Sequence, residues 1–253
     1  MFFRTVSNRV SSAAKILAIA ALATMPFTLS AQNASIRVVH GIPGPDVSPD
    51  LDPALPVDVL VNDAVCLLSG FNFGEIAGPF SIPGGTYNVK VSLANSLEPC
   101  SGDAVIAADV PFAAGENASI VAHLTDGGAP TASKFVNDTS APIVGNVRLI
   151  AHHVANAPVV DILVPGRFSS TPLLWVPGVA NIPGMNQAAA ELPATQAQIS
   201  ILPAGTNTSI YSRIGQLRAG LTYTAYAVGS LTNGTFAIIL ESIGGIQDVT
   251  ITF

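Results

Sequence analysis

The segment VDVLV at residues 57–61 occurs again, with one change, as VDILV at residues 160–164. An earlier pair of segments matches in the same way: IRVVH at residues 36–40 and VRLI at residues 147–150. All four segments are short and rich in β-branched residues, which is typical of β-strands. The sequence therefore predicts one β-rich unit that is present twice.

The spacing between matched residues changes only where loops are expected. Arg37 corresponds to Arg148 at an offset of 111, and Asp58 to Asp161 at an offset of 103. The difference gives unit one eight extra residues in its Pro- and Asp-rich loop between these points. A later fall in the offset predicts a second insertion in unit one, around residues 95–103. Loops tolerate such insertions better than strands do.

Short apolar segments recur roughly every ten residues and are separated by turns rich in glycine and proline. Asn62-Asp63 is expected to form the tight turn of a hairpin, and no long stretch keeps the 3.6-residue period of a helix. The pattern predicts an all-β protein of two tandem antiparallel β-sandwiches, immunoglobulin-like or transthyretin-like, at residues 32–140 and 141–253. The expected strands include residues 33–39, 56–61, 64–68, 87–91, 104–110, 118–124, 134–136, 221–228, 236–240 and 249–253.

Residues 1–31 have the composition of a secretory signal peptide. Three basic residues lie in the part that precedes a mostly apolar stretch at residues 16–29, and Ser30-Ala31 then offers a small-residue cleavage site. The apolar stretch is short for a membrane-spanning helix, although a retained anchor helix is the alternative interpretation. We expect the mature chain to be secreted, periplasmic or held at the cell surface.

The charge balance argues against nucleic acid as a partner. Removing residues 1–31 takes away three basic residues and no acidic one, which moves the formal net charge from −6 to −9. The basic residues left are scattered, so no basic stripe is available for phosphates. No later apolar run reaches the length of a membrane-spanning helix, so the mature chain is expected to have no transmembrane span.

The ordered motifs of both units resemble a family of bacterial secreted proteins, domain of unknown function 4397 (DUF4397), in two tandem copies. In unit one the resemblance rests on residues 36–40, PVDV at 56–59, IPGGTYNVKV at 82–91 and Ala114-Gly115. In unit two it rests on residues 147–153, VVDI at 159–162 and RAGLTYT at 218–224. Unit two departs from the pattern where Ala194-Thr195 replaces the Gly-Gly pair.

The resemblance implies an exported β-sandwich at the bacterial envelope or beyond. It implies no particular activity, cofactor or ligand. The IPGGTY string is also common in transthyretin-like and starch-binding-like modules, so it does not by itself distinguish among β-sandwich families.

Cys66 and Cys100 are the two cysteines of the chain, and both lie in unit one. An even number of cysteines in an exported protein favours a disulfide. Closing a loop of this size stabilises a fold by roughly 3–4 kcal/mol in the chain-entropy model. Two buried free thiols are the alternative.

Asp46, Asp50 and Asp52 lie close together in the extra loop of unit one. Carboxylates on a loop suit calcium, which takes six to eight oxygen ligands with loose geometry. These residues are therefore a candidate calcium site. Their spacing matches no known calcium-loop pattern, and the competing interpretation is a solvated acidic loop.

Asp58 and Asp161 stand in strands whose other residues are apolar. Strand alternation places each carboxylate on the face opposite its valine neighbours, where it is either exposed or hydrogen-bonded by a nearby loop or by Arg37 or Arg148. We expect a structural role. The histidines at 40, 123, 152 and 153 are candidates for a metal or catalytic role, but His152 and His153 are adjacent, so in a strand they point to opposite faces and cannot share an ion. Histidines in loops or at strand ends are the favoured interpretation.

Carbohydrate binding requires an exposed aromatic face. Trp175 is the candidate ligand contact, with a buried core tryptophan as the alternative. Tyr223 and Tyr226 are three residues apart, so they face opposite sides of a strand and cannot form one platform.

The sequence contains no nucleophile elbow, no zinc-protease motif and no phosphate-binding glycine loop. We therefore expect a non-enzymatic module for adhesion or ligand binding, with surface polysaccharide or an envelope protein as partner. A structural spacer or assembly subunit is the second hypothesis, and a secreted hydrolase with paired carboxylates is the third.

Overall fold

A computed structural model of the chain describes residues 32–163, 187–194, 196–243 and 251–252. The chain divides into the units Met1–Ser30 and Ala31–Phe253, and all the described elements belong to the second unit. The predicted signal peptide and Trp175 lie outside the described residues.

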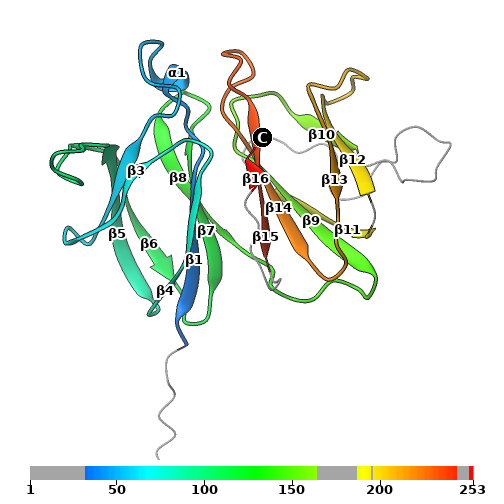
Figure 1. Ribbon diagram of the computed structural model, residues 1–253, viewed down its shortest axis with the longest axis horizontal. Coiled ribbons are helices and arrows are strands. Elements are labelled where there is room, and N and C mark those ends of the chain that lie inside the picture. Colours follow the sequence, from blue (N-terminus) through cyan, green and yellow to red (C-terminus); the bar gives the residue numbers. More distant parts are fainter. Residues whose placement is uncertain (1–31, 164–186, 195, 244–250, 253) are drawn as a thin grey trace, which may run out of the picture. The chain divides into compact units, whose positions relative to one another are not determined.

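The first sandwich consists of two four-stranded sheets (Figure 1). One sheet has the order β4-β1-β7-β8, and the other has the order β3-β2-β5-β6. A four-residue helix, α1 (Gly44–Val47), lies in the loop after β1. The strands are β1 (Ala34–His40), β2 (Val57–Val61), β3 (Val65–Phe71), β4 (Ile76–Ile82), β5 (Gly85–Leu93), β6 (Ala104–Phe112), β7 (Asn117–Leu124) and β8 (Pro130–Val136).

The second sandwich repeats this strand order in its described part. Its sheets have the orders β11-β9-β14-β15-β16 and β10-β12-β13, so that β9 and β14 correspond to β1 and β7. Strand β10 contains the VDIL segment, the counterpart of VDVL in β2. It pairs with β12 as β2 pairs with β5. The strands are β9 (Asn146–His153), β10 (Val160–Leu163), β11 (Gln187–Pro193), β12 (Gln196–Pro203), β13 (Tyr211–Gln216), β14 (Thr222–Val228), β15 (Ala237–Ile243) and β16 (Ile251–Thr252).

The all-β prediction is confirmed, but the sheets are not purely antiparallel. β1 pairs in parallel with β7, and β9 pairs in parallel with β14. Between β1 and β7 the chain forms strands in both sheets, and this long connection allows it to return beside β1 in the same direction.

Local sequence explains both the successes and the misses among the predicted strands. Asn62 and Asp63 both adopt φ of 53°, which is the backbone of the predicted hairpin turn between β2 and β3. Strand β4 was not predicted because Gly78 and Pro79 interrupt its apolar pattern. Since β4 is an edge strand, its proline removes no ladder bond from a central position.

Alternate residues of each strand build the cores. In the first sandwich, Val57 and Val59 of β2 are buried against residues of the opposite sheet. In the second, Leu149 and Ile201 from opposite sheets belong to one buried cluster. A further apolar cluster joins the two sandwiches and contains Val39, Val121, Val154, Tyr226, Val228 and Ile239.

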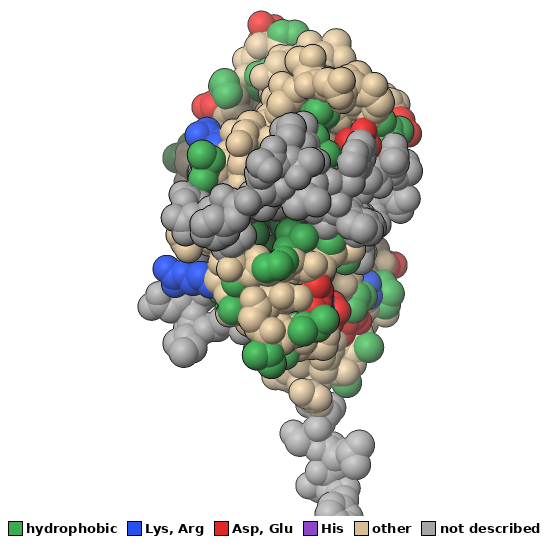
Figure 2. Space-filling model, turned by 90° about the vertical axis from the view of Figure 1, so that its right-hand side faces the viewer, with side chains coloured by type: hydrophobic (Ala, Val, Ile, Leu, Met, Phe, Trp, Pro, Cys, Tyr) green, Lys and Arg blue, Asp and Glu red, His purple; other side chains and the backbone are tan. Residues whose placement is uncertain are grey.

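Charged residues make up 10% of the chain. On the face of the molecule in Figure 2, the few Lys and Arg side chains lie apart from one another. None of the helices in the described residues is long and apolar enough to cross a membrane.

Candidate functional site

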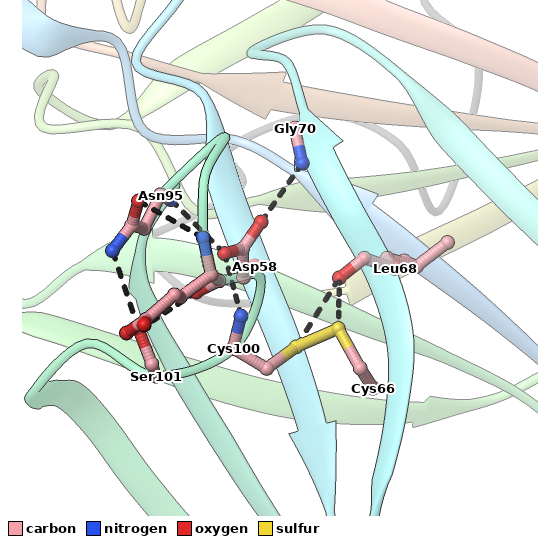
Figure 3. Close-up of a disulfide and its surroundings, with 8 residues drawn as sticks. Asp58, Cys66, Leu68, Gly70, Asn95, Cys100 and Ser101 are labelled. Carbon is pink, nitrogen blue, oxygen red and sulfur yellow. Dashed lines mark hydrogen bonds between the residues drawn. A yellow bond between two sulfur atoms is a disulfide. The ribbon is translucent and has the colours of Figure 1, made fainter.

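Asp58 organises the loop that covers the outer face of the sheet β3-β2-β5-β6 (Figure 3). Asp58 is fully buried. Its carboxylate accepts hydrogen bonds from the backbone N–H groups of Gly70 at 2.9 Å, Asn95 at 3.1 Å and Cys100 at 2.8 Å. Burial opposes ionisation, but these hydrogen bonds outweigh it and hold the pKa of Asp58 below its ordinary value. Of the possibilities that the sequence left open for Asp58, the structure confirms the one in which a nearby loop donates hydrogen bonds to the carboxylate.

The arginines considered as partners for this carboxylate are engaged elsewhere. Arg37 pairs with Glu241, and Arg148 pairs with Asp138 and Glu191. In the second sandwich Asp161 repeats the loop contact, since it accepts the backbone N–H of Gly205 at 3.1 Å.

The predicted disulfide between Cys66 and Cys100 is present. It joins edge strand β3 to the loop between β5 and β6, which contains the predicted insertion at residues 95–103. The loop is also held internally, because Asn95 Oδ1 accepts the backbone N–H of Leu97 at 3.1 Å and Ser101 Oγ donates to the carbonyl of Glu98 at 2.7 Å.

A polar pocket lies beside this stapled loop. It has a volume of about 340 Å³, and its wall consists of Leu60, Asp63, Lys90, Ser92 and residues 100–104. Lys90 of β5 pairs with Asp63, which lies in the turn between β2 and β3. Ammonium, carboxylate and hydroxyl groups together provide both donors and acceptors, which suits a hydroxyl-rich ligand. The sequence pointed to this site only through the insertion and the cysteine pair.

The three candidate calcium ligands do not converge. Asp46 accepts hydrogen bonds from Asn233 Nδ2 at 2.9 Å and Thr235 Oγ1 at 2.7 Å. Asp52 accepts the backbone N–H of Ala54 at 2.9 Å, and Asp50 is exposed. Among the residues that the structure describes, no group of three or more His, Cys, Asp or Glu side chains has the arrangement of a metal site. The calcium hypothesis stays a prediction.

The histidines lie at or next to the ends of β1, β7 and β9, as expected, and all four are buried. His40 Nε2 lies 2.8 Å from the carbonyl of Leu55, and His153 Nε2 lies 3.0 Å from that of Pro158. His152 points to the other side of β9 and stacks on Tyr226 with ring centroids 5.2 Å apart. Burial lowers the pKa of His152 to about 4.

A buried polar network between the sandwiches was not predicted. Glu241 of β15 accepts a hydrogen bond from Tyr226 at 2.6 Å and one from Ser119 of β7 at 3.1 Å. Its other oxygen lies 3.5 Å from Arg37 Nε of β1. As expected, Tyr223 and Tyr226 face opposite sides of β14, the first in the core of the second sandwich and the second in this network.

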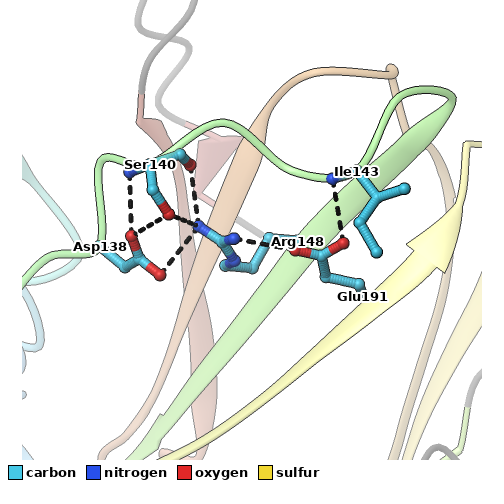
Figure 4. Close-up of polar contacts among 5 residues, drawn as sticks. All are labelled: Asp138, Ser140, Ile143, Arg148 and Glu191. Carbon is cyan, nitrogen blue, oxygen red and sulfur yellow. Dashed lines mark hydrogen bonds and ion pairs between the residues drawn. The ribbon is translucent and has the colours of Figure 1, made fainter.

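Arg148 fastens the connector between β8 and β9 (Figure 4). Its guanidinium pairs with Asp138 at 2.9 Å and donates to the carbonyl of Ser140 at 2.8 Å, both in the connector. It also pairs with Glu191 of β11 at 2.8 Å, and that carboxylate accepts the backbone N–H of Ile143. The connector is therefore held against the second sandwich at several points.

The fold defines a protein of the β-sandwich class. The family model "Domain of unknown function (DUF4397)" matches residues 34–163, which is half of the chain. The chain belongs to this family. None of the curated proteins compared with it matches its sequence.

Three solved structures are similar to the chain at low identity. The Bacillus anthracis TIE protein is 12% identical with a TM-score of 0.25, over 78% of this chain and 34% of that protein, so the chain spans about a third of its length. The fimbrial anchor protein Mfa2 from Porphyromonas gingivalis is 11% identical with a TM-score of 0.30, over 87% of this chain and 99% of that one. The family 26 carbohydrate-binding module of Eubacterium rectale Amy13K, solved with maltoheptaose, is 9% identical with a TM-score of 0.23, over 88% and 97%. At these TM-scores the similarities transfer neither a ligand nor a partner to this chain.

Proposed function

We propose that the protein is an exported, non-enzymatic module that binds a hydroxyl-rich ligand, such as a surface polysaccharide, at the bacterial envelope or outside the cell. The observation that carries the proposal is the polar pocket beside the disulfide loop. In our proposal the second sandwich is a second copy of the family domain, and residues 1–31 direct export.

The pocket depends on features that unit one has and unit two lacks. The loop between β5 and β6 (residues 94–103) is longer than the corresponding loop between β12 and β13 (residues 204–210), and both cysteines belong to unit one. The loop is fixed by the disulfide and by the hydrogen bonds that the backbone N–H groups of Asn95 and Cys100 donate to Asp58. A wall held in place before the ligand arrives reduces the entropy that binding would otherwise cost.

The groups in the pocket suit sugar hydroxyls. Lys90 donates hydrogen bonds, Asp63 and Asp103 accept them, and the hydroxyls of Ser92 and Ser101 do both. The lining contains no aromatic ring for a sugar to stack on. We therefore expect weak binding at a single site, which many copies on a surface would strengthen through avidity.

The test is a binding screen of the purified mature protein against cell-wall and surface polysaccharides, with calcium and again with chelator. Lys90→Met and Asp103→Asn should each weaken a saturable interaction about tenfold, which is about 1.4 kcal/mol. Asp109→Asn, on strand β6 and outside the pocket, is the matched control and should bind as the parent does.

Each result of the screen bears on a different part of the proposal. Loss of binding on chelation would show that a divalent cation takes part in binding, and the loop with Asp46, Asp50 and Asp52 would then be the first candidate for its site. Binding that is indifferent to chelation would keep the pocket without a metal. Absence of any saturable ligand would overturn the binding function and favour the second candidate.

That second candidate is a structural spacer or assembly subunit. It is favoured by the buried contacts of Arg37 and Ser119 with Glu241, which join the two sandwiches. If this junction makes the protein a stiff spacer, amide relaxation should give both sandwiches one rotational correlation time. Glu241→Ala should then separate the two values, whereas the exposed Glu98→Ala should not.

Export can be tested directly. Fractionation of the native host should find the protein outside the cytoplasm, and its first residue should be Gln32. A protein that begins at Met1 and stays with the membrane would support the retained anchor helix instead.

A further inference from the structure

An apolar cavity of about 250 Å³ lies between the two sheets of the first sandwich. Ile36 and Ile120 line it from one sheet, and Val59 and Ile106 line it from the other. Its wall contains no charged residue, and its polar side chains are those of Asn62 and Tyr87. The polar pocket is a separate site, because its walls come from the outer side of β2 and β5.

The buried core of this sandwich consists of two clusters, and residues of both line the cavity. Buried residues around Val57 and Val91 form one cluster, and those around Phe112 and Ile120 form another. Val89 and Ala132 contact both clusters but are only half-buried. In the described part of the second sandwich, the buried residues of both sheets form a single cluster instead.

The cavity opens along one side of the sandwich. On the other side the edge strands β6 and β8 lie against each other. β3 and β4 are the remaining edge strands, and both contribute wall residues, among them Leu67 and Phe80. Val65 of β3 belongs to the wall and is 55% exposed, whereas Ile106 at the inner end is 7% exposed. The wall therefore runs from solvent into the core between β3 and β4.

We propose that this cavity binds one linear alkyl chain, such as the acyl chain of a medium-chain lipid. Apolar cavities of about 150 Å³ admit benzene, with six carbons, so a volume of about 250 Å³ admits roughly ten carbons in proportion. A sugar or a peptide strand would leave its hydrogen-bonding groups unpaired against this wall, which is costly. An alkyl chain brings no such groups and removes apolar wall surface from water, at about 25 cal/mol per Å².

The first test uses the full mature protein with methyl-labelled Ile and Val, titrated with decan-1-ol. Saturable shifts are expected for the methyl groups of Val59, Ile106 and Ile120. Those of Ile162 and Ile201, in the core of the second sandwich, should not move. No shift up to the solubility limit of decanol, or equal shifts in both sandwiches, would overturn the proposal.

The second test fills the cavity. Ala108 of β6 faces the cavity, while Ala107 next to it is exposed on the other side of the strand. Ala108→Leu should weaken decanol binding at least tenfold, and Ala107→Leu should leave it unchanged. Equal binding by both variants would contradict an alkyl site here. If Ala108→Leu fails to fold, the methyl shifts of the parent protein still decide the question.

The proposal concerns an alkyl chain and not an added β-strand from another protein. A short apolar peptide should therefore not compete with decanol. Saturable competition by such a peptide, with new amide protection along β3 or β4, would replace the lipid with a peptide partner. The decanol tests are independent of the polysaccharide screen. The residues substituted to test the polar pocket are different from those substituted to test the cavity.

Discussion

The carboxylate of Asp58 lies 2.8 Å from the backbone nitrogen of Cys100, which is 42 residues further along the chain. This contact connects the strand that contains the VDVLV segment to the loop closed by the disulfide. The same carboxylate also accepts a hydrogen bond from the backbone N–H of Gly70 in β3. One buried side chain therefore links the β2–β3 hairpin to the loop between β5 and β6. The shape of the polar pocket therefore depends on a residue outside its lining.

Replacing this carboxylate should destabilise the first sandwich. Asp58→Asn places an NH₂ group where backbone N–H donors converge, so we expect a loss of about 2–4 kcal/mol in the free energy of unfolding. Urea unfolding monitored by circular dichroism measures it. Asp109→Asn, at an exposed position, should change stability by less than about 0.5 kcal/mol. Similar small losses for both variants would show that the buried network is not important for stability.

Removing the disulfide should weaken the fold and the pocket together. For Cys66→Ala with Cys100→Ala we expect a loss of about 3–4 kcal/mol, because the unfolded chain regains the freedom of its closed loop. Thermal unfolding of the parent protein with and without reductant also compares the stability of the fold with and without the disulfide. A parent protein whose unfolding midpoint is unchanged by complete reduction would contradict this expectation.

Stability should fall as the pH is lowered below neutrality. Burial lowers the pKa of His152 to about 4 from an ordinary value of 6.5, so the folded protein excludes a proton that the unfolded chain accepts. The folded state therefore has its full free energy of unfolding above about pH 6.5, where His152 is neutral in both states. As the pH falls toward 4, protonation of His152 in the unfolded chain reduces this free energy by on the order of 3 kcal/mol. Urea midpoints between pH 7.5 and 4.5 measure it.

His152→Phe is the matched variant for the pH effect. It keeps an aromatic ring between Phe135 and Tyr226 and removes the titrating group. The pH dependence should become shallower without vanishing, because burial also lowers the pKa of His40, His123 and His153. An unchanged slope would exclude His152 as a source of the effect.

The junction between the sandwiches should not tolerate a side chain at Gly41. A Cβ there would lie 2.7 Å from the carbonyl oxygen of Ala122 and 2.7 Å from Cγ1 of Val228. We expect Gly41→Ala to cost about 1–3 kcal/mol, as overpacked sites do. Gly215→Ala is the control, since its Cβ would meet nothing within 4 Å, and it should be neutral or slightly stabilising. Equal thermal midpoints for the two variants would mean that the junction can open without cost.

Much of this architecture was predictable from short-range patterns. The alternation in VDVLV placed Val57 and Val59 on the inner face, and the turn at Asn62-Asp63 fixed the hairpin. Both depend on neighbours in sequence, because side-chain direction alternates with every residue and tight turns select particular residues. The disulfide was predictable from the even cysteine count and the expectation of export.

Each of the strands β1, β7, β9 and β14 has one face in the core of its own sandwich. The burial of the opposite face, where the two sandwiches meet, was not predictable from the sequence. Arg37 and Glu241 look in sequence like ordinary surface residues of two separate units. Each is almost completely buried where the sandwiches meet. A charged side chain is tolerated at such a position when a partner is present, and the partner here is 204 residues away in the chain.

The sequence alone determined that the chain is all-β, contains an internal repeat and has a cysteine pair confined to unit one. These properties follow from local periodicity, turn chemistry and composition. Only the tertiary structure decided that Asp58 is buried under a loop, that the first core contains an open cavity and that histidines lie inside. Burial depends on what packs on each face of a strand, and strands distant in sequence supply that packing.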